Sequence, residues 1–266
     1  MPDQILGDRY EVEQQLGEKS GRRTLLAQDL QTQTPVILKL IVRDAEVLSS
    51  DLTLFQHEIE VLKTLNHPAT SHYFGSFEIE LPEEGKAFVL VRSYVEGTSL
   101  FQYLQQGIRL TEAEAQQLGK AVLEILCDLH QHQPPIIHRG INPGNILLAS
   151  PPQTMIDRVS LVDFGLIKSL SPYDETTASM VGTDGYTPPE QMGRRAVQAS
   201  DLYSLGVTLI TAMTSIDPVE LPRNGMRIDI AKVLSGHPKF LEWLQNMTAP
   251  ELSDRFPAAE AALAAL

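Results

Sequence analysis

The hydrophobic pattern of this chain changes period near residue 95, and this change constrains its fold more than any other feature. Before it, β-branched and apolar residues form short runs, such as residues 36–41, between turn-forming residues such as 31–34. After Gly97, apolar residues recur every three or four positions, as they do on one face of a helix. The sequence therefore predicts an α+β, bilobal chain. Its N-terminal lobe, 1–94, has five antiparallel strands and one helix, and its C-terminal lobe, 95–266, is helical.

Individual elements follow from the same periods. We expect an antiparallel meander with strands at 9–12, 24–27 and 36–41, then a helix at 52–65 that ends before Pro68, and two further strands at 73–79 and 87–94. In the second part, helices are expected at 99–106, 111–132, 200–213, 239–247 and from 258 to the end. Thr111-Glu112-Ala113-Glu114 is typical of a helix start, because the first and fourth residues can cap each other's backbone.

Composition excludes several classes of protein. The single cysteine, Cys127, cannot form an internal disulfide, and no Cys/His cluster suggests a zinc site. The net charge of −13 disfavours broad attraction to nucleic acid or to anionic membranes. No apolar run is long enough to span a bilayer, and residues 1–4 lack the start of a signal peptide, so a cytoplasmic protein is expected.

Three segments carry most of the functional information. Residues 138–148 read His-Arg-Gly-Ile-Asn-Pro-Gly-Asn-Ile-Leu-Leu, Asp163-Phe164-Gly165 follows, and residues 182–190 read Gly-Thr-Asp-Gly-Tyr-Thr-Pro-Pro-Glu. In this order and spacing they resemble the protein kinase family, and specifically the bacterial relatives of eukaryotic Ser/Thr kinases. The resemblance runs from about Tyr10 to Leu266. It implies one kinase-like domain over 1–266, ATP and Mg²⁺ as cofactors, and a protein substrate or partner.

The resemblance also implies roles for single residues. Lys39 would neutralise nucleotide phosphates and form an ion pair with Glu58. Asp163 and Asn145 would offer oxygen atoms to Mg²⁺, which prefers oxygen ligands. Scaffolding roles fall to Asp201 below the catalytic loop, to an ion pair of Glu190 with Arg255, and to a stack formed by Leu62, Tyr73, His138 and Phe164.

The catalytic loop departs from the family pattern at two positions. Gly140 stands where active kinases have the aspartate that orients the substrate hydroxyl and accepts its proton. Because a positioned general base contributes about 10²–10⁴-fold, its loss would slow transfer severely. Asn142 replaces the lysine that Ser/Thr kinases use on the γ-phosphate.

The phosphate-binding loop departs as well. Only Gly17 remains of its three glycines, and Lys19 and Arg22 occupy the other two positions. Either their charges, with that of Arg23, replace backbone contacts to an anion, or this segment is a solvated basic turn that binds nothing.

The resemblance also defines a base-binding slot. Its residues would be Thr24, Ile37, Arg92, Ser93, Val95 and Leu147. Ile37 replaces a small alanine above the base, and Arg92 occupies the position at the back of the slot that is normally uncharged. We expect Arg92 to pair with Glu58 or Asp163, because an unpaired cation is costly at that depth. The alternative is that our alignment is shifted by one residue and Arg92 faces water.

Other candidate residues receive simpler interpretations. The histidines at 57, 67, 72, 130 and 132 lack metal-ligand spacing and are expected to be surface or capping residues. Thr176, Thr177 and Ser179 are either sites of phosphorylation by another kinase or plain loop residues.

Three functions are compatible with these departures. The first is a pseudokinase, a regulatory or scaffolding module that retains possible ATP binding. The second is a weakly active kinase that transfers the ATP γ-phosphate to protein Ser/Thr. The third, a small-molecule phosphotransferase, ranks last because the chain retains the segment 182–190.

Overall fold

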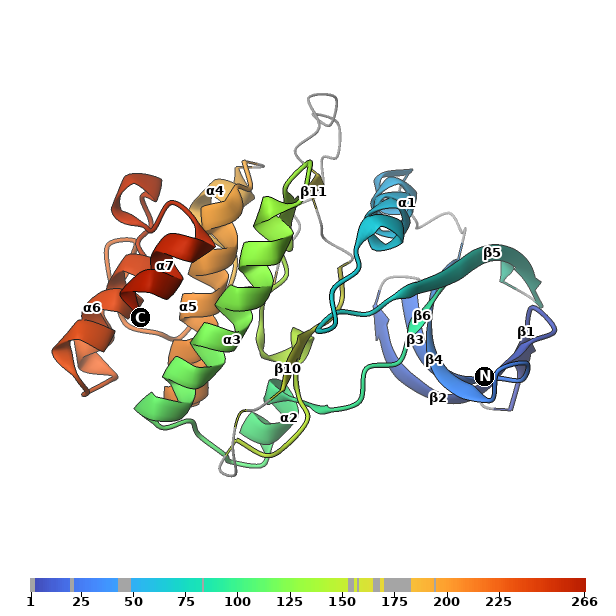
Figure 1. Cartoon of the computed structure of the whole chain (residues 1–266), viewed down its shortest axis with the longest axis horizontal. Coiled ribbons are helices and arrows are strands. Elements are labelled where there is room, and N and C mark those ends of the chain that lie inside the picture. Colours follow the sequence, from blue (N-terminus) through green and yellow to red (C-terminus); the bar gives the residue numbers. More distant parts are fainter. Residues whose placement is uncertain are drawn as a thin grey trace. The chain divides into compact units, whose positions relative to one another are not determined.

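The structure is a computed structural model. It describes residues 3–19, 22–42, 49–82, 84–152, 156, 158–164, 168–169, 183–193 and 195–266. Within it the chain divides into two compact units, Met1–Val95 and Glu96–Leu266. The division falls one residue after the one expected from the sequence. The first unit is a sheet with one helix and the second is mainly helical, as an α+β kinase-like fold requires (Figure 1).

An antiparallel sheet of six strands forms the first unit, in the order β1-β2-β3-β4-β6-β5. The strands are β1 Ile5–Leu6, β2 Tyr10–Lys19, β3 Arg22–Asp29, β4 Thr34–Val42, β5 Tyr73–Leu81 and β6 Gly85–Ser93. One expectation was wrong: the sheet has a sixth strand, because β1 is too short to show a period. The meander expected for the first three strands is confirmed as β2-β3-β4, and β4 then pairs with β6 rather than with β5. Burial explains the order: β6 is continuously buried near its end, whereas β5 alternates between exposed and half-buried residues, as suits an edge strand.

The two faces of this sheet have different roles. One face forms an apolar core that includes Val36, Leu38 and Leu40 of β4 together with Val89 and Val91 of β6. Because side chains alternate along a strand, the intervening residues of β4 and β6 share the opposite face. We call this opposite face the helix-facing side, since it contacts α1, which spans Ser49–Thr64.

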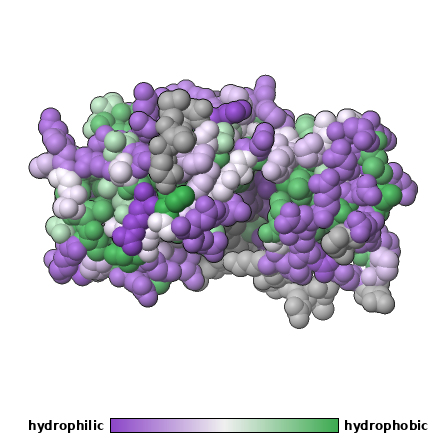
Figure 2. All heavy atoms as spheres, turned by 90° about the horizontal axis from the view of Figure 1, so that it is seen from below, coloured by the Kyte–Doolittle hydropathy of each residue, from purple (hydrophilic) through white to green (hydrophobic). Residues whose placement is uncertain are grey.

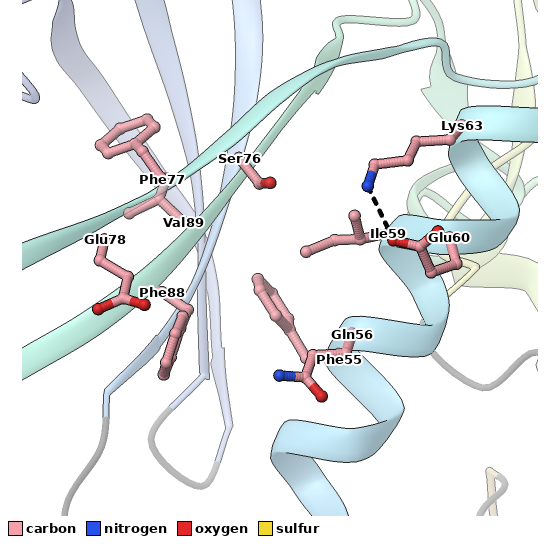
Figure 3. A pocket seen from close by; sticks show the side chains of 10 residues that line it. All are labelled: Phe55, Gln56, Ile59, Glu60, Lys63, Ser76, Phe77, Glu78, Phe88 and Val89. Atoms are coloured by element: carbon pink, nitrogen blue, oxygen red, sulfur yellow. Dashed lines mark hydrogen bonds and ion pairs between the residues drawn. The ribbon is translucent and has the colours of Figure 1, made fainter.

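Apolar contacts hold α1 against this side of the sheet. Phe55 and Ile59 point from α1 toward the strands, and Phe88 of β6 lies across from them (Figure 3). A shallow groove of about 400 Å³ runs between them, and Lys63 and Glu60 form an exposed ion pair of 2.8 Å at its rim. The helix predicted at 52–65 is thus confirmed, with a start three residues earlier.

Six helices lie in the described part of the second unit: α2 Leu100–Gln105, α3 Glu112–Gln131, α4 Pro189–Met192, α5 Gln198–Thr214, α6 Pro238–Met247 and α7 Ala259–Ala265. Nearly every residue of α5 is buried, and α3 packs against both α5 and α7 (Figure 1). The predicted capping start of α3 is confirmed. The Thr111 hydroxyl accepts from the Glu114 backbone N–H at 3.3 Å, and the Glu114 carboxylate accepts from the Thr111 N–H at 2.6 Å.

Short strands place the functional loops of the second unit. Strand β9, Ile146–Leu148, pairs with β7, Thr98–Ser99, on one side and with β10, Val159–Leu161, on the other. Two further pairs join β8, Ile136–Ile137, to β11, Lys168–Ser169, and β12, Arg223–Asn224, to β13, Arg227–Ile228. Single 3₁₀ turns cover Pro143–Asn145, Ile230–Lys232 and Leu252–Asp254.

Hydrophilic side chains cover most of each unit on the face shown in Figure 2, with apolar side chains scattered among them. Among the described residues, none of the helices has the length and apolar character needed to cross a membrane.

Candidate functional site

A buried ion pair joins β4 to α1 in the first unit. Lys39 Nζ donates to both carboxylate oxygens of Glu58, at 2.8 and 3.1 Å, and only 8% and 2% of the two residues is exposed. This is the pair expected from the sequence. Because removing one partner would leave a buried charge uncompensated, the pair fixes the position of the lysine relative to α1.

Arg92 lies on the same helix-facing side of the sheet as Lys39. It is paired across the strands with Ile37, and Lys39 with Leu90, so Arg92 is the diagonal neighbour of the lysine. Only 6% of Arg92 is exposed, so the alternative that it faces water is wrong. Its Nε and Nη1 atoms have no hydrogen-bond partner among the described residues, so the predicted ion pair with Glu58 is wrong. Glu58, the expected partner in this unit, is bound to Lys39 instead.

Other residues assigned to base binding are distributed over both units. Thr24 is paired across the strands with Lys39 and shares its side of the sheet, and Ile37 is buried there with 7% exposed. The Ser93 hydroxyl is engaged locally, since it accepts from the His72 N–H at 2.8 Å. Val95, partly buried, ends the first unit. Leu147 belongs to β9 of the second unit and is partly exposed. Their role in base binding stays a prediction.

The structure describes part of the segment that was expected to bind phosphate. Gly17 is exposed, and a Cβ atom added there would meet nothing within 4 Å, so its surroundings leave room for a side chain. Arg23 is already neutralised, because it contacts Glu84 at 2.7 Å and Glu18 at 3.3 Å. The role of Arg23 toward an anion stays a prediction. Residues 20 and 21 and the side chain of Lys19 lie outside the described part of the chain.

A buried aspartate on α5 holds the catalytic loop of the second unit. Asp201 is fully buried, and its carboxylate accepts from the backbone N–H groups of His138 at 2.9 Å and Arg139 at 2.8 Å. Arg139 has φ +63°, a conformation that side-chain-bearing residues adopt only at a cost and that functional loops often contain. The predicted anchoring role of Asp201 is confirmed.

Gly140 lies at the centre of this loop with its backbone fully engaged. Its N–H donates to His138 Nδ1 at 3.2 Å, and its carbonyl accepts from the side-chain amides of Asn145 at 2.8 Å and Asn142 at 3.0 Å. Asn142 also accepts from the Gly144 N–H at 2.8 Å, so this side chain caps the turn that follows. Gly140 is not among the residues with positive φ, so the backbone conformation does not require glycine here.

Asn145 and Asp163, the predicted metal ligands, are brought together by β9 and β10. Ile146 pairs with Leu161 across the two strands, and the Val162 N–H donates to the Asn145 carbonyl at 3.0 Å. Because the Asn145 amide donates to Gly140, its Oδ1 remains as an acceptor, and Asp163 adds a carboxylate. These oxygen donors fit Mg²⁺, which usually takes one or two carboxylates and completes its shell with phosphate and water. No cluster of three or more Asp, Glu, His or Cys side chains with metal-binding geometry occurs among the described residues.

Part of the predicted stack lies within the second unit. The rings of His138 and Phe164 are 4.9 Å apart at 60°, and Phe164 is fully buried. The other two members, Leu62 and Tyr73, belong to the first unit.

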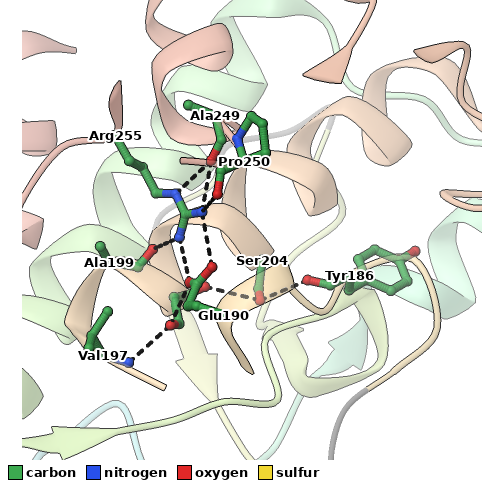
Figure 4. Close-up of polar contacts among 9 residues, drawn as sticks. Tyr186, Glu190, Val197, Ala199, Ser204, Ala249, Pro250 and Arg255 are labelled. Atoms are coloured by element: carbon green, nitrogen blue, oxygen red, sulfur yellow. Dashed lines mark hydrogen bonds and ion pairs between the residues drawn. The ribbon is translucent and has the colours of Figure 1, made fainter. Parts of the chain in front are cut away.

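The predicted ion pair of Glu190 with Arg255 is confirmed (Figure 4). Arg255 donates to both carboxylate oxygens, at 2.7 and 3.3 Å, and to the backbone carbonyls of Ala249, Pro250 and Ala199. Ser200 donates a further hydrogen bond of 2.7 Å to Glu190. The network therefore ties α4 to α5 and to the segment before α7.

Two residues around the catalytic loop were missed or misread. His130 was expected to be a surface or capping residue, but it is buried and its Nε2 lies 3.1 Å from Asp201. Its spacing of four residues from Leu126, on the apolar face of α3, could have indicated this. Gln191 is buried and donates to the Arg139 carbonyl at 2.9 Å, and no pattern in the sequence marks it. Thr176, Thr177 and Ser179 lie outside the described residues.

Comparison with known proteins adds to this geometry. A model of the protein kinase domain matches residues 10–257. The chain is 31% identical to Serine/threonine-protein kinase B of Synechocystis sp., over 98% of this chain and 46% of that protein. It is 29% identical to Serine/threonine-protein kinase PknA of Nostoc sp., over 99% and 48%, and 31% identical to Serine/threonine-protein kinase PknB of Mycobacterium tuberculosis, over 80% and 33%. The chain thus spans less than half the length of these relatives.

Proposed function

Because this chain belongs to the protein kinase domain family, we propose that it is a pseudokinase: a regulatory or scaffolding module that binds a nucleoside triphosphate but transfers its phosphate poorly. The observation that carries the proposal is Gly140. The loop around it is held by Asp201, Asn145 and Gln191, yet glycine presents no side chain to orient a hydroxyl or accept its proton.

Nucleotide binding is supported by what the chain keeps. Lys39 is held by Glu58 in the arrangement that family members use on the α- and β-phosphates. Asn145 and Asp163 offer oxygen atoms suited to Mg²⁺, which, when bound, would neutralise charge on the phosphates. A protein partner or substrate is proposed because the similar proteins are named Ser/Thr protein kinases.

A second candidate is a weakly active Ser/Thr protein kinase. Phosphoryl transfer relies mainly on positioning and on electrostatic stabilisation, which Lys39, Asn145 and Asp163 could supply without a carboxylate base. The intact pair of Lys39 with Glu58 favours this candidate.

A transfer assay with radiolabelled nucleotide separates the two. We expect the unmodified protein to show no transfer above an Asp163→Ala control, and Gly140→Asp alone not to reach the turnover of an active kinase, because Ile37, Arg92 and the phosphate loop also differ. Robust autophosphorylation by Gly140→Asp would instead mean that one substitution silenced a working kinase. Transfer by the unmodified protein that Asp163→Ala abolishes would establish the weak kinase.

A further inference from the structure

Among the described residues, the helix-facing side of the first unit carries two buried cations, Lys39 and Arg92, and one buried carboxylate, Glu58. Both oxygens of Glu58 accept hydrogen bonds from Lys39. Only 6% of Arg92 is exposed, and its Nε and Nη1 atoms have no hydrogen-bond partner among the described residues. A buried guanidinium is normally paired or fully hydrogen-bonded, since leaving its N–H groups unsatisfied is costly. An acceptor supplied by a ligand would remove this cost.

The strand register indicates which part of a nucleotide would meet Arg92. Lys39 is the group expected on the phosphates. Arg92 lies one step further along the sheet, opposite Ile37, at the end of β6 just before Ser93. A diagonal neighbour on one face of a sheet is about 7–8 Å away, so Arg92 lies beside the lysine and one residue pair nearer the end of β6. Since Ile37 is the residue expected to cover the base, Arg92 would meet the base.

Adenine fits such a residue poorly. Its six-position carries an amino group, which is a donor, and a guanidinium has only donors. At this edge of adenine Arg92 could donate only to N7, while a second N–H group would face the amino group. Guanine and hypoxanthine carry an oxygen at the same position, beside the acceptor N7, and arginine binds this O6/N7 pair through two parallel hydrogen bonds.

We propose that Arg92 is a specificity-determining residue that makes this site prefer a 6-oxopurine nucleotide, such as GTP or ITP, to ATP. The proposal rests on the proposed function, because it takes for granted that a purine nucleotide binds at Lys39. It is also a point at which the residues present disagree with the ATP that the family implies, whereas Lys39, Asn145 and Asp163 agree with the binding of nucleotide phosphates and Mg²⁺.

The test is a pair of nucleotides that differ at the six-position, with oxygen in ITP and an amino group in ATP. Dissociation constants are measured by titration calorimetry with Mg²⁺. We expect ITP to bind about tenfold or more tightly than ATP, which corresponds to about 1.4 kcal/mol. Arg92→Met should abolish this ratio, and Arg92→Lys, which keeps the charge but loses the planar fork, should reduce it. Arg9→Met removes a cation from the turn between β1 and β2 of the same unit and should leave the ratio unchanged, which controls for net charge.

The unmodified protein alone tests the proposal, whether or not the variants fold. Equal or tighter binding of ATP would overturn the preference and leave nucleotide binding intact. A preference for ITP that survives in Arg92→Met would also overturn it, because another group would then read the base. If neither nucleotide binds, with Lys39→Ala as the reference for no binding, both the preference and the proposed function fail.

Discussion

Replacing Arg255 with alanine is expected to destabilise the second unit far more than loss of one surface charge would. The side chain of Arg255 is fully buried, and that of its partner Glu190 is 10% exposed. Arg255 makes six hydrogen bonds, two to the carboxylate and four to backbone carbonyls. The alanine variant would leave Glu190 with only its bond to Ser200.

The magnitude follows from this burial. Breaking a buried ion pair by removing one partner costs about 3–5 kcal/mol, because the remaining charge is uncompensated. For a unit of this size each kcal/mol lowers the melting temperature by about 2–4 °C, so a decrease of about 6–20 °C is expected. Glu190→Gln should cost less, since the amide keeps one acceptor and Arg255 keeps its four bonds to carbonyls.

The assay is thermal and urea unfolding followed by circular dichroism, with Arg227→Ala as the matched control. Arg227 contacts Asp254 at 3.0 Å in the same unit, but the two side chains are 43% and 52% exposed. Exposed pairs contribute about 0–1 kcal/mol, so this variant should unfold close to the unmodified protein. If Arg255→Ala and Arg227→Ala lost the same stability, the argument from burial would be refuted.

Three further predictions concern single side chains. The hydrogen bonds from Arg9 hold the pKa of Asp29 well below its usual range, so the ionised carboxylate stabilises the fold at any pH above its unfolded-state pKa. Asp29→Asn should therefore lower the free energy of unfolding at pH 7. In urea unfolding, the difference in this free energy between the unmodified protein and the variant should shrink below about pH 4. Arg92→Met should raise the free energy of unfolding of the nucleotide-free protein by about 1 kcal/mol or more, because it removes unsatisfied buried N–H groups, and an unchanged or lower value in thermal unfolding would contradict this. Burial, followed by the charge of Glu260, raises the pKa of the Cys127 thiol to about 11, so iodoacetamide at pH 8 should label it much more slowly than in urea, and equal rates would contradict this.

Much of the fold could be predicted because the elements have strong local signals. The capping start at Thr111 and the apolar period behind it place α3 within a residue or two. The same logic fails for β1, which is two residues long, and for the position of β5 at the edge of the sheet. Strand order depends on which strand is buried on both sides, and that depends on contacts distant in sequence.

Some residues of the candidate site could also be predicted from the sequence and others could not. Asp201 and the pair of Lys39 with Glu58 were predicted, because the motifs that contain them have fixed spacing. The missing partner of Arg92 Nε and Nη1 among the described residues, and the two carboxylates that contact Arg23, were not predicted, because the sequence shows which residues carry charge but not which opposite charges lie within reach. Glu84, which neutralises Arg23, is 61 residues away in the chain.

The shape of the catalytic loop does not depend on the side chain that it lacks. Its backbone is held by Asp201 at His138 and Arg139, and by Asn145 at the carbonyl of Gly140. None of these bonds involves a side chain at position 140, and the backbone there has no positive φ that would favour glycine. The loop scaffold is therefore compatible with glycine at position 140. The pseudokinase proposed above requires this combination, because its function would depend on the kinase fold and on what binds to it rather than on rapid transfer.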